Sequence, residues 1–322
     1  MKPIILRHIL TLFALSFVTG LSWAEGGRTT DPTDWLVRAV HSSQSMTYSG
    51  VYTFSHDGKS ETSRIMHIND AEGEHGKLES LDGPPREIIR ENDHIACYLP
   101  ENHMVKLDRI EGRRFFPALL SESPTQLKEF YNLSFAGTDR VAGRECRLIR
   151  LDPKDGFRFS YRLCADSQTG LILRASMEDS PRGVLQVFTF TEFIADGGLD
   201  AAKLKPSWNG SGWTWDRSGL SQDQEIAWVV SNPPQGFHKV TEMHRGAEGR
   251  SSPLIQMVYS DGLATVSVFV EPARSNSMTT ESRRGALSFY STRVGDQQVT
   301  AIGEVPPATV AQLAKSAGLL KK

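Results

Sequence analysis

The sequence predicts an α+β protein that is mostly antiparallel β, with a large half-barrel domain and a smaller C-terminal α+β domain. Three observations predict this fold. Segments of alternating apolar and polar residues recur from residue 47 to residue 193, separated by Gly, Pro, Asn or Asp. A meander of about nine or more such strands must curl to bury one face around the helix that precedes it. The length of 322 residues is sufficient for about two domains.

The large domain is expected to open with a helix that Asp31 caps and that has Pro32 at its first position. The apolar residues that repeat on one face of this helix are Trp35, Leu36, Ala39 and Val40. The first strand, Thr47–His56, places Tyr48, Tyr52 and Phe54 on one side, and Asp57-Gly58 turns the chain back. The further strand candidates are Arg64–Asn69, Lys77–Leu81, Arg86–Arg90, Ile95–Leu99, His103–Leu107, Leu133–Thr138, Leu171–Met177 and Val184–Phe193. A short helix is predicted at Thr125–Tyr131.

Domain boundaries follow from changes in this pattern. We expect a signal peptide in residues 1–24, the half-barrel domain in 25–200, a linker in 201–223 and the small domain in 224–322. Residues 206–212 (PSWNGSG) have little periodicity, which favours a linker. The strand candidates of the small domain are Phe237–His244, Ile255–Tyr259, Ala264–Glu271, Ala286–Tyr290 and Gln298–Ile302. A last helix is predicted to begin at Pro306-Pro307 and to end at Gly318, with a buried stripe of Val310, Leu313, Ala314 and Ala317.

The N-terminus has the pattern of a secretory signal peptide. Lys2, Arg7 and His8 precede an apolar stretch of residues 9–20, which is too short to span a membrane. Small residues at Ser22 and Ala24 then predict cleavage before Glu25. We therefore expect an exported, soluble mature protein.

Export makes a disulfide between Cys146 and Cys164 chemically possible. Lys154-Asp155-Gly156 is typical of a three-residue hairpin loop with Gly in the left-handed conformation. That loop would pair Leu151 with Phe159, Ile149 with Tyr161, and the two cysteines with each other at a non-hydrogen-bonded site. Two buried thiols remain the alternative, and Cys97 is left over as a buried small residue.

Composition and motifs argue against several function classes. The balance of 36 Lys+Arg against 38 Asp+Glu excludes a nucleic-acid-binding protein that relies on bulk basicity. The sequence has no phosphate loop, dinucleotide fingerprint, zinc-protease helix or Cys-x-x-Cys motif. We expect no catalytic residues, no metal site and no cofactor, although a pair of glycosidase carboxylates stays open.

One segment suggests a binding site for an amphiphile. Arg113 and Arg114 stand directly before the apolar run Phe115–Leu120. Guanidinium groups bind phosphate through paired hydrogen bonds, and phenyl rings can contact an acyl chain. The alternative is a basic strand end that leads into a core segment.

Several stretches of the chain together have the pattern of one known family. In the first domain they are Trp35–Tyr48, Leu81–Glu87 (LDGPPRE) and the hairpin that contains Asp155-Gly156 and Phe159–Tyr161. In the second domain they are Pro234–Phe237, Tyr259–Leu263, Arg283-Arg284 and Gly303–Pro307. They span nearly the whole mature chain in order. Through these stretches the sequence resembles the MucB/RseB family of periplasmic regulators of the sigma-E envelope-stress response.

The resemblance implies a large domain like the periplasmic lipoprotein carriers, an open antiparallel half-barrel over helices. It implies a regulator that binds the periplasmic region of a RseA/MucA-like anti-sigma factor and shields it from site-1 proteolysis. A lipid signal, such as lipopolysaccharide or a related acyl ligand, would weaken this binding. The family also implies a homo-oligomer located in the periplasm.

The resemblance also guides the choice of site residues. The expected lipid-binding residues are Tyr52, Phe54, Phe115, Phe116 and Leu120 as apolar contacts, with Arg113 and Arg114 near the head group. Arg283 and Arg284 are the expected partner-binding residues, with a solvated basic face as the alternative. Asp261-Gly262 is interpreted as a hairpin turn rather than as a site.

Two other functions stay open. A carrier of lipids or lipoproteins would use the same half-barrel, but simple carriers of this fold end near 200 residues and this chain continues for about a hundred more. An envelope hydrolase with carboxylates scattered over the strands is the third possibility.

Overall fold

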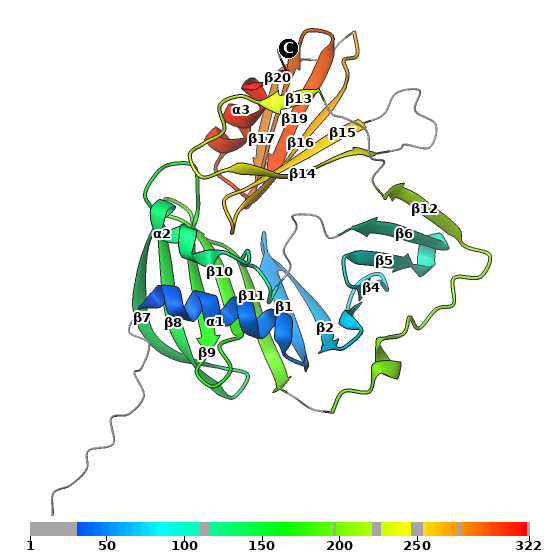
Figure 1. Cartoon of the computed structure of the whole chain (residues 1–322), viewed down its shortest axis with the longest axis vertical. Coiled ribbons are helices and arrows are strands. Elements are labelled where there is room, and N and C mark those ends of the chain that lie inside the picture. Colours follow the sequence, from blue (N-terminus) through cyan, green and yellow to red (C-terminus); the bar gives the residue numbers. More distant parts are fainter. Residues whose placement is uncertain are drawn as a thin grey trace, which may run out of the picture. The chain divides into compact units, whose positions relative to one another are not determined.

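The structure of the chain is a computed structural model that describes residues 31–109, 116–195, 198–220, 227–245, 254–275 and 278–320. Figure 1 shows a large curled sheet and a second, smaller sheet with its own helix. Within the described ranges the strands form sheets of 12, six and two strands. These residues all belong to one unit that begins at Asp31.

The 12-stranded sheet has the order β12-β6-β5-β4-β3-β2-β1-β11-β10-β9-β8-β7. Its strands are β1 (Tyr48–His56), β2 (Lys59–Asp70), β3 (Gly73–Ser80), β4 (Glu87–Glu91), β5 (His94–Leu99), β6 (Met104–Arg109), β7 (Tyr131–Val141), β8 (Arg144–Pro153), β9 (Ser160–Asp166), β10 (Ile172–Asp179), β11 (Gly183–Ala195) and β12 (Thr214–Gly219). Neighbours are antiparallel except β12 and β6, which are parallel. The end strands β12 and β7 do not pair with each other, so the sheet is open. The predicted half-barrel is confirmed.

Helix α1 (Pro32–Ser45) runs across strands β7 to β11 in Figure 1. The Asp31 carboxylate accepts a hydrogen bond from the Thr33 amide at 2.7 Å and so caps the helix as predicted. Its apolar face is buried against the large sheet through Leu36, Ala39 and Val40. A short 3-10 turn, η2 (Pro124–Gln126), and helix α2 (Leu127–Phe130) cover the end of β7, where a short helix was expected.

The second sheet has the order β14-β15-β16-β19-β18-β17. Its strands are β14 (His238–Arg245), β15 (Leu254–Ser260), β16 (Thr265–Pro272), β17 (Thr280–Arg284), β18 (Leu287–Val294) and β19 (Gln297–Gly303). Helix α3 (Pro307–Lys315) buries Val310, Leu313 and Ala314 against it. Strands β13 (Trp228–Val230) and β20 (Ala317–Leu319) form the two-stranded sheet, so the last helix ends at Lys315 rather than at Gly318. The predicted small α+β domain is confirmed, and the sequence missed β13, β17 and β20.

The segment expected to be a linker is packed onto the large sheet over much of its length. It contains the turn η3 (Ala201–Leu204) and β12, and Trp208 and Trp213 pack against the small core around Val105. The Ser207 hydroxyl and amide contact the Glu87 carboxylate at 2.5 and 2.8 Å, and Lys77 pairs with Glu87 at 2.8 Å. A weakly periodic sequence therefore folds here because tryptophans and a buried ion pair hold it.

The β8–β9 hairpin differs from the predicted register by two residues. Ile149 lies opposite Leu163, and Leu151 lies opposite Tyr161. The loop runs from residue 154 to 159 and is longer than predicted because the Asp155 carboxylate accepts a hydrogen bond from the Phe157 amide at 2.9 Å. Gly156 has no positive φ. A shift of two residues keeps every side chain on its face, so the apolar pattern could not detect it.

Cys146 and Cys164 are joined by a disulfide, with a Cα–Cα distance of 5.3 Å. In the observed register they are diagonal neighbours, since Cys146 lies opposite Asp166 and Cys164 lies opposite Leu148. Both cysteines are buried, whereas Cys97 on β5 is free and half-buried.

At the end of β9 in the same hairpin, the Asp166 carboxylate is expected to make the free energy of unfolding depend on pH. Burial raises the pKa of Asp166, but hydrogen bonds from Arg144 and Thr169 outweigh burial and hold it below the usual 3.8. A lowered folded-state pKa stabilises the fold above pH 3.8, and this stabilisation is lost as the pH falls through the folded-state value. The free energy of unfolding of D166N should therefore approach that of the native chain as the pH is lowered from about 6 to about 3 in urea titrations. A constant difference over this range would contradict the assignment.

Candidate functional site

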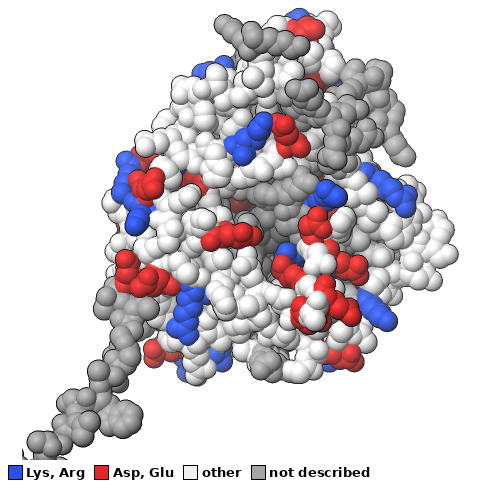
Figure 2. Space-filling view, viewed as in Figure 1, with Lys and Arg blue, Asp and Glu red and all other residues white. Residues whose placement is uncertain are grey.

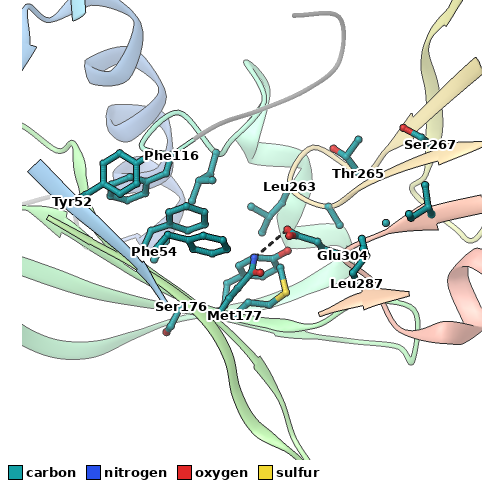
Figure 3. A pocket seen from close by; sticks show the side chains of 18 of the residues that line it. Tyr52, Phe54, Phe116, Ser176, Met177, Leu263, Thr265, Ser267, Leu287 and Glu304 are labelled. Carbon is teal, nitrogen blue, oxygen red and sulfur yellow. Dashed lines mark hydrogen bonds between the residues drawn. The ribbon is translucent and has the colours of Figure 1, made fainter. Parts of the chain in front are cut away.

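A cavity of about 430 Å³ lies between the concave face of the large sheet and the loops of the six-stranded sheet (Figure 3). We call it the inter-sheet cavity. Its lining is mostly apolar, and Glu304 is the one charged side chain among the described residues that line it. An apolar cavity with few polar groups is typical of a site for a hydrophobic ligand.

One wall of the inter-sheet cavity is aromatic. Tyr52 and Phe54 on β1 lie opposite Phe190 and Phe188 on β11 in the antiparallel register. The alternation of the strands places all four side chains on the same face of the sheet. The ring centroids of Phe54 and Phe188 are 4.2 Å apart and stacked, and Phe116 packs on Phe188 at 5.3 Å. Cross-strand aromatic pairs of this kind fix the rings, so the wall is preformed.

The opposite wall comes from the six-stranded sheet. Leu263, Leu287 and Ile302 contribute apolar surface, and the Gln186 amide of β11 donates a hydrogen bond to the Glu304 carboxylate at 3.0 Å (Figure 3). Burial raises the pKa of the Tyr161 phenol well above 10, so this lining group is neutral at physiological pH. Both sheets thus complete the cavity, and the hydrogen bond between Gln186 and Glu304 joins the two parts of its lining.

The predicted lipid-binding residues have different positions. Tyr52, Phe54 and Phe116 line the inter-sheet cavity. Leu120 is buried in the core, and its neighbour Leu119 reaches the cavity instead. Arg113, Arg114 and Phe115 lie outside the described residues. The sequence missed the lining residues Phe188, Met177, Gln186, Leu263 and Glu304. The alternation of apolar and polar residues in the strand Val184–Phe193 could have identified Phe188. No pattern in the sequence indicates that residues of the six-stranded sheet line the same cavity.

A buried ion pair links the two sheets beside the cavity. The Arg158 Nε donates a hydrogen bond to the Asp261 Oδ2 at 2.6 Å, and both side chains are fully buried. Arg158 Nη2 also donates to the Gln235 carbonyl at 2.5 Å, and Nη1 contacts Asp155 at 2.5 Å. Burial raises the pKa of Tyr131 well above 10, and its neutral hydroxyl donates to Asp261 at 3.3 Å. Asp261 therefore forms a turn, as predicted, and also an ion pair that the sequence did not reveal.

Aromatic rings enclose this ion pair. The Arg158 guanidinium carbon lies 4.7 Å from the ring centroid of Phe130, at the end of α2, and 4.9 Å from that of Phe237, directly before β14. Gly236 has a φ of +87°, and an added Cβ there would lie 2.5 Å from the Phe130 ring. We call Arg158, Asp261 and the residues that contact them the latch. In the latch, the aromatic rings keep water away from the ion pair of Arg158 and Asp261, which connects the two sheets.

The predicted partner-binding arginines are unequal in exposure. Arg283 forms an ion pair with Asp179 of β10 at 2.8 Å, and its guanidinium carbon lies 4.9 Å from the ring of Phe159. Its side chain is only 12% exposed. Arg284 is 77% exposed and lies 3.4 Å from Asp57. Arg283 thus connects the two sheets within the chain, and Arg284 is accessible from solvent.

The face of the molecule drawn in Figure 2 is not dominated by a single charge. On the face in Figure 2, basic and acidic side chains are interspersed, and acidic side chains gather beside a central hollow. No helix among the described residues is long and apolar enough to cross a membrane. Within the same residues, no three His, Cys, Asp or Glu side chains form a metal-binding group.

The two sheets, the cavity between them and the latch define a binding protein with an open antiparallel half-barrel. Two family models match the chain: the MucB/RseB N-terminal domain over residues 31–208 and the MucB/RseB C-terminal domain over residues 222–318. The chain therefore belongs to the MucB/RseB family, as the sequence predicted.

Curated relatives and solved structures agree with this assignment. The chain is 27% identical to "Sigma factor AlgU regulatory protein MucB" of Pseudomonas aeruginosa over 292 residues. This alignment covers 89% of this chain and 90% of the relative. It is 28% identical to "Sigma-E factor regulatory protein RseB" of Haemophilus influenzae over 258 residues. This alignment covers 78% of this chain and 79% of the relative. The structure of the P. aeruginosa MucA/MucB complex matches with 25% identity and a TM-score of 0.73, over 91% of this chain and 100% of that chain. MucB alone matches at the same identity with a TM-score of 0.64, over 91% of this chain and 99% of that chain.

Proposed function

We propose that this chain is a periplasmic negative regulator of a sigma-E-type envelope stress response. It binds the periplasmic region of an anti-sigma factor and shields that region from site-1 proteolysis. The observation that carries the proposal is family membership over both domains, together with the solved complexes of the relative MucB with MucA. Such a protein acts by binding and needs no catalytic residues.

The same proposal covers location and domain organisation. The N-terminal pattern supports export to the periplasm with cleavage before Glu25, which permits the Cys146–Cys164 disulfide. The half-barrel domain of residues 25–200 carries most of the apolar cavity, and the small domain of residues 224–322 completes it. Family resemblance also supports assembly of several copies in solution.

A lipid signal would act through the inter-sheet cavity. Lipopolysaccharide or a related acyl ligand is the proposed occupant, because the lining is apolar and both sheets contribute to it. A ligand that fills this cavity contacts both sheets and can favour one arrangement of them over another. If the ligand weakens binding of the anti-sigma factor by some factor, the anti-sigma factor weakens binding of the ligand by the same factor.

The first test is calorimetric titration of the purified mature chain with the periplasmic segment of the host's anti-sigma factor. We expect binding that becomes at least about tenfold weaker when lipopolysaccharide is added at saturating concentration, since coupling free energies of about 1–3 kcal/mol are typical. A digestion with the site-1 protease should show the segment protected by the chain and released by the lipid. Absence of binding to the segment would refute the regulator.

Arg284 is expected to contribute to binding of the anti-sigma factor because it is exposed on the edge strand β17. We expect R284A to weaken the titrated affinity by up to about fivefold, because an exposed ion pair contributes about 0.2–1 kcal/mol. R293A, an exposed arginine on the neighbouring strand β18, is the matched control and should leave the affinity unchanged. Equal affinities for R284A and the native chain would remove Arg284 from the interface.

A lipid or lipoprotein carrier is the second candidate, favoured by the open half-barrel and its apolar cavity. The same titrations separate the two functions. A carrier would take up acyl ligands but would not bind the anti-sigma factor segment.

A further inference from the structure

The concave face of the half-barrel contains a second cavity of about 110 Å³, which we call the half-barrel cavity. Strands β1 to β5, Ser43 of α1 and the segment Phe116–Ala118 line it. Its apolar side chains include Tyr48, Ile65 and Ile88, and its charged side chains are Glu74, Lys77 and Arg90. Its polar side chains include His67, whose ring nitrogens lie 2.7 Å from the Met46 carbonyl and 3.0 Å from the Glu74 carboxylate. These polar atoms already have partners, so the free surface of the cavity is mainly hydrocarbon.

The two cavities share the lining residues Leu78 and Phe116. Leu78 lies near the C-terminal end of β3, paired with Ile65 on one side and Ile88 on the other, so its position is fixed by the sheet. Phe116 lies outside any helix or strand. Its ring is nevertheless almost fully buried, because it packs on Tyr52 at 5.2 Å, Phe188 at 5.3 Å and Phe190 at 5.1 Å between ring centroids. Phe116 is therefore a firmly packed partition between two apolar spaces.

We propose that Phe116 sets the length of the acyl chain that this protein binds. The inference rests on the lipid-binding part of the proposed function and names its ligand class as an unbranched hydrocarbon chain. A chain that enters the inter-sheet cavity ends at the Phe116 ring. Removal of the ring joins this space to the half-barrel cavity, whose mainly apolar lining can accept further methylene groups.

The test is calorimetric titration of the purified protein with octanoate, laurate and palmitate. Burial of each additional methylene tightens binding by about fourfold. For the native protein we expect affinity to increase with chain length until the chain reaches the Phe116 ring, and then to stop increasing. F116A should bind palmitate at least about tenfold more tightly than the native protein does, with F116L intermediate. F193L alters an aromatic side chain of the same core that is not part of either lining, and it should match the native protein.

The outcomes separate this inference from the proposed function. If the native protein and F116A bind palmitate equally while both bind laurate, Phe116 is not a length limit and only this inference fails. If no fatty acid binds any variant, the proposed lipid signal fails and the inference fails with it. If circular dichroism shows that F116A does not fold, F116L replaces it in the titrations. A further titration with 3-hydroxylaurate identifies the source of the chain, because tighter binding than laurate favours a lipopolysaccharide chain and equal binding a phospholipid chain.

Discussion

Replacing Arg158 by alanine is expected to lower the free energy of unfolding by about 3–5 kcal/mol. The substitution leaves the Asp261 carboxylate buried without its cation, and both side chains of the pair have no exposed surface. It also empties the space between the rings of Phe130 and Phe237, which the guanidinium fills. The cost of an unpaired buried charge far exceeds the cost of losing an exposed pair.

Urea denaturation followed by tryptophan fluorescence measures this effect. The control is R284A, which removes an arginine that also links the two sheets but is exposed, and it should change the free energy of unfolding by less than about 1 kcal/mol. The double variant R158M/D261L replaces both charges by apolar side chains and should recover much of the loss, since buried pairs often tolerate such replacement. Similar losses for R158A and R284A would show that the latch does not stabilise the fold.

The latch also bears on the proposed switch. Arg158 belongs to the hairpin loop of the half-barrel, whereas Asp261 and the Gln235 carbonyl belong to the second domain. Interfaces between domains of one chain are usually modest, and relative motion is the default expectation. A buried ion pair at this junction favours one relative arrangement of the sheets. A ligand in the neighbouring cavity can therefore switch the protein only if its own contacts strengthen or oppose that preference.

Local sequence signals predicted those elements in which neighbouring residues determine the structure. Asp31 and Pro32 fix the start of α1, and the Asp31 carboxylate makes the expected cap. Asp57 and Gly58 both adopt positive φ, as a two-residue hairpin loop requires, and they set the pairing of β1 with β2. The alternation in Thr47–His56 placed Tyr52 and Phe54 on one side, where both line the cavity.

The features that the sequence could not predict depend on contacts between distant residues. Arg158 and Asp261 are 103 positions apart, and nothing near either residue indicates a buried partner. The register of β8 and β9 depends on how Asp155 folds its loop, and a shift by two residues leaves the hydrophobic pattern unchanged. Strand β12 forms because Trp208 and Trp213 find apolar surface on the large sheet, which composition alone does not show.

The disulfide is expected to have the second large effect on stability. Cys146 and Cys164 are separated by 18 positions, and closing a loop of this length in the unfolded chain corresponds to about 3 kcal/mol in the chain-entropy model. We therefore expect C146A/C164A to lower the free energy of unfolding by about 2–4 kcal/mol in urea denaturation. Export to an oxidising compartment is the condition under which this bond persists.

A reductant provides the matched comparison. Dithiothreitol should destabilise the native chain by about as much as C146A/C164A does, and should leave that variant almost unaffected. C97A, which removes the free cysteine of β5, should retain the full response to reductant because it leaves the bond intact. Mass spectrometry of the unreduced protein should show one peptide pair joined through Cys146 and Cys164. Free thiols at both positions, together with stability that is insensitive to reductant, would show that the hairpin folds without the bond and that strand pairing alone fixes its register.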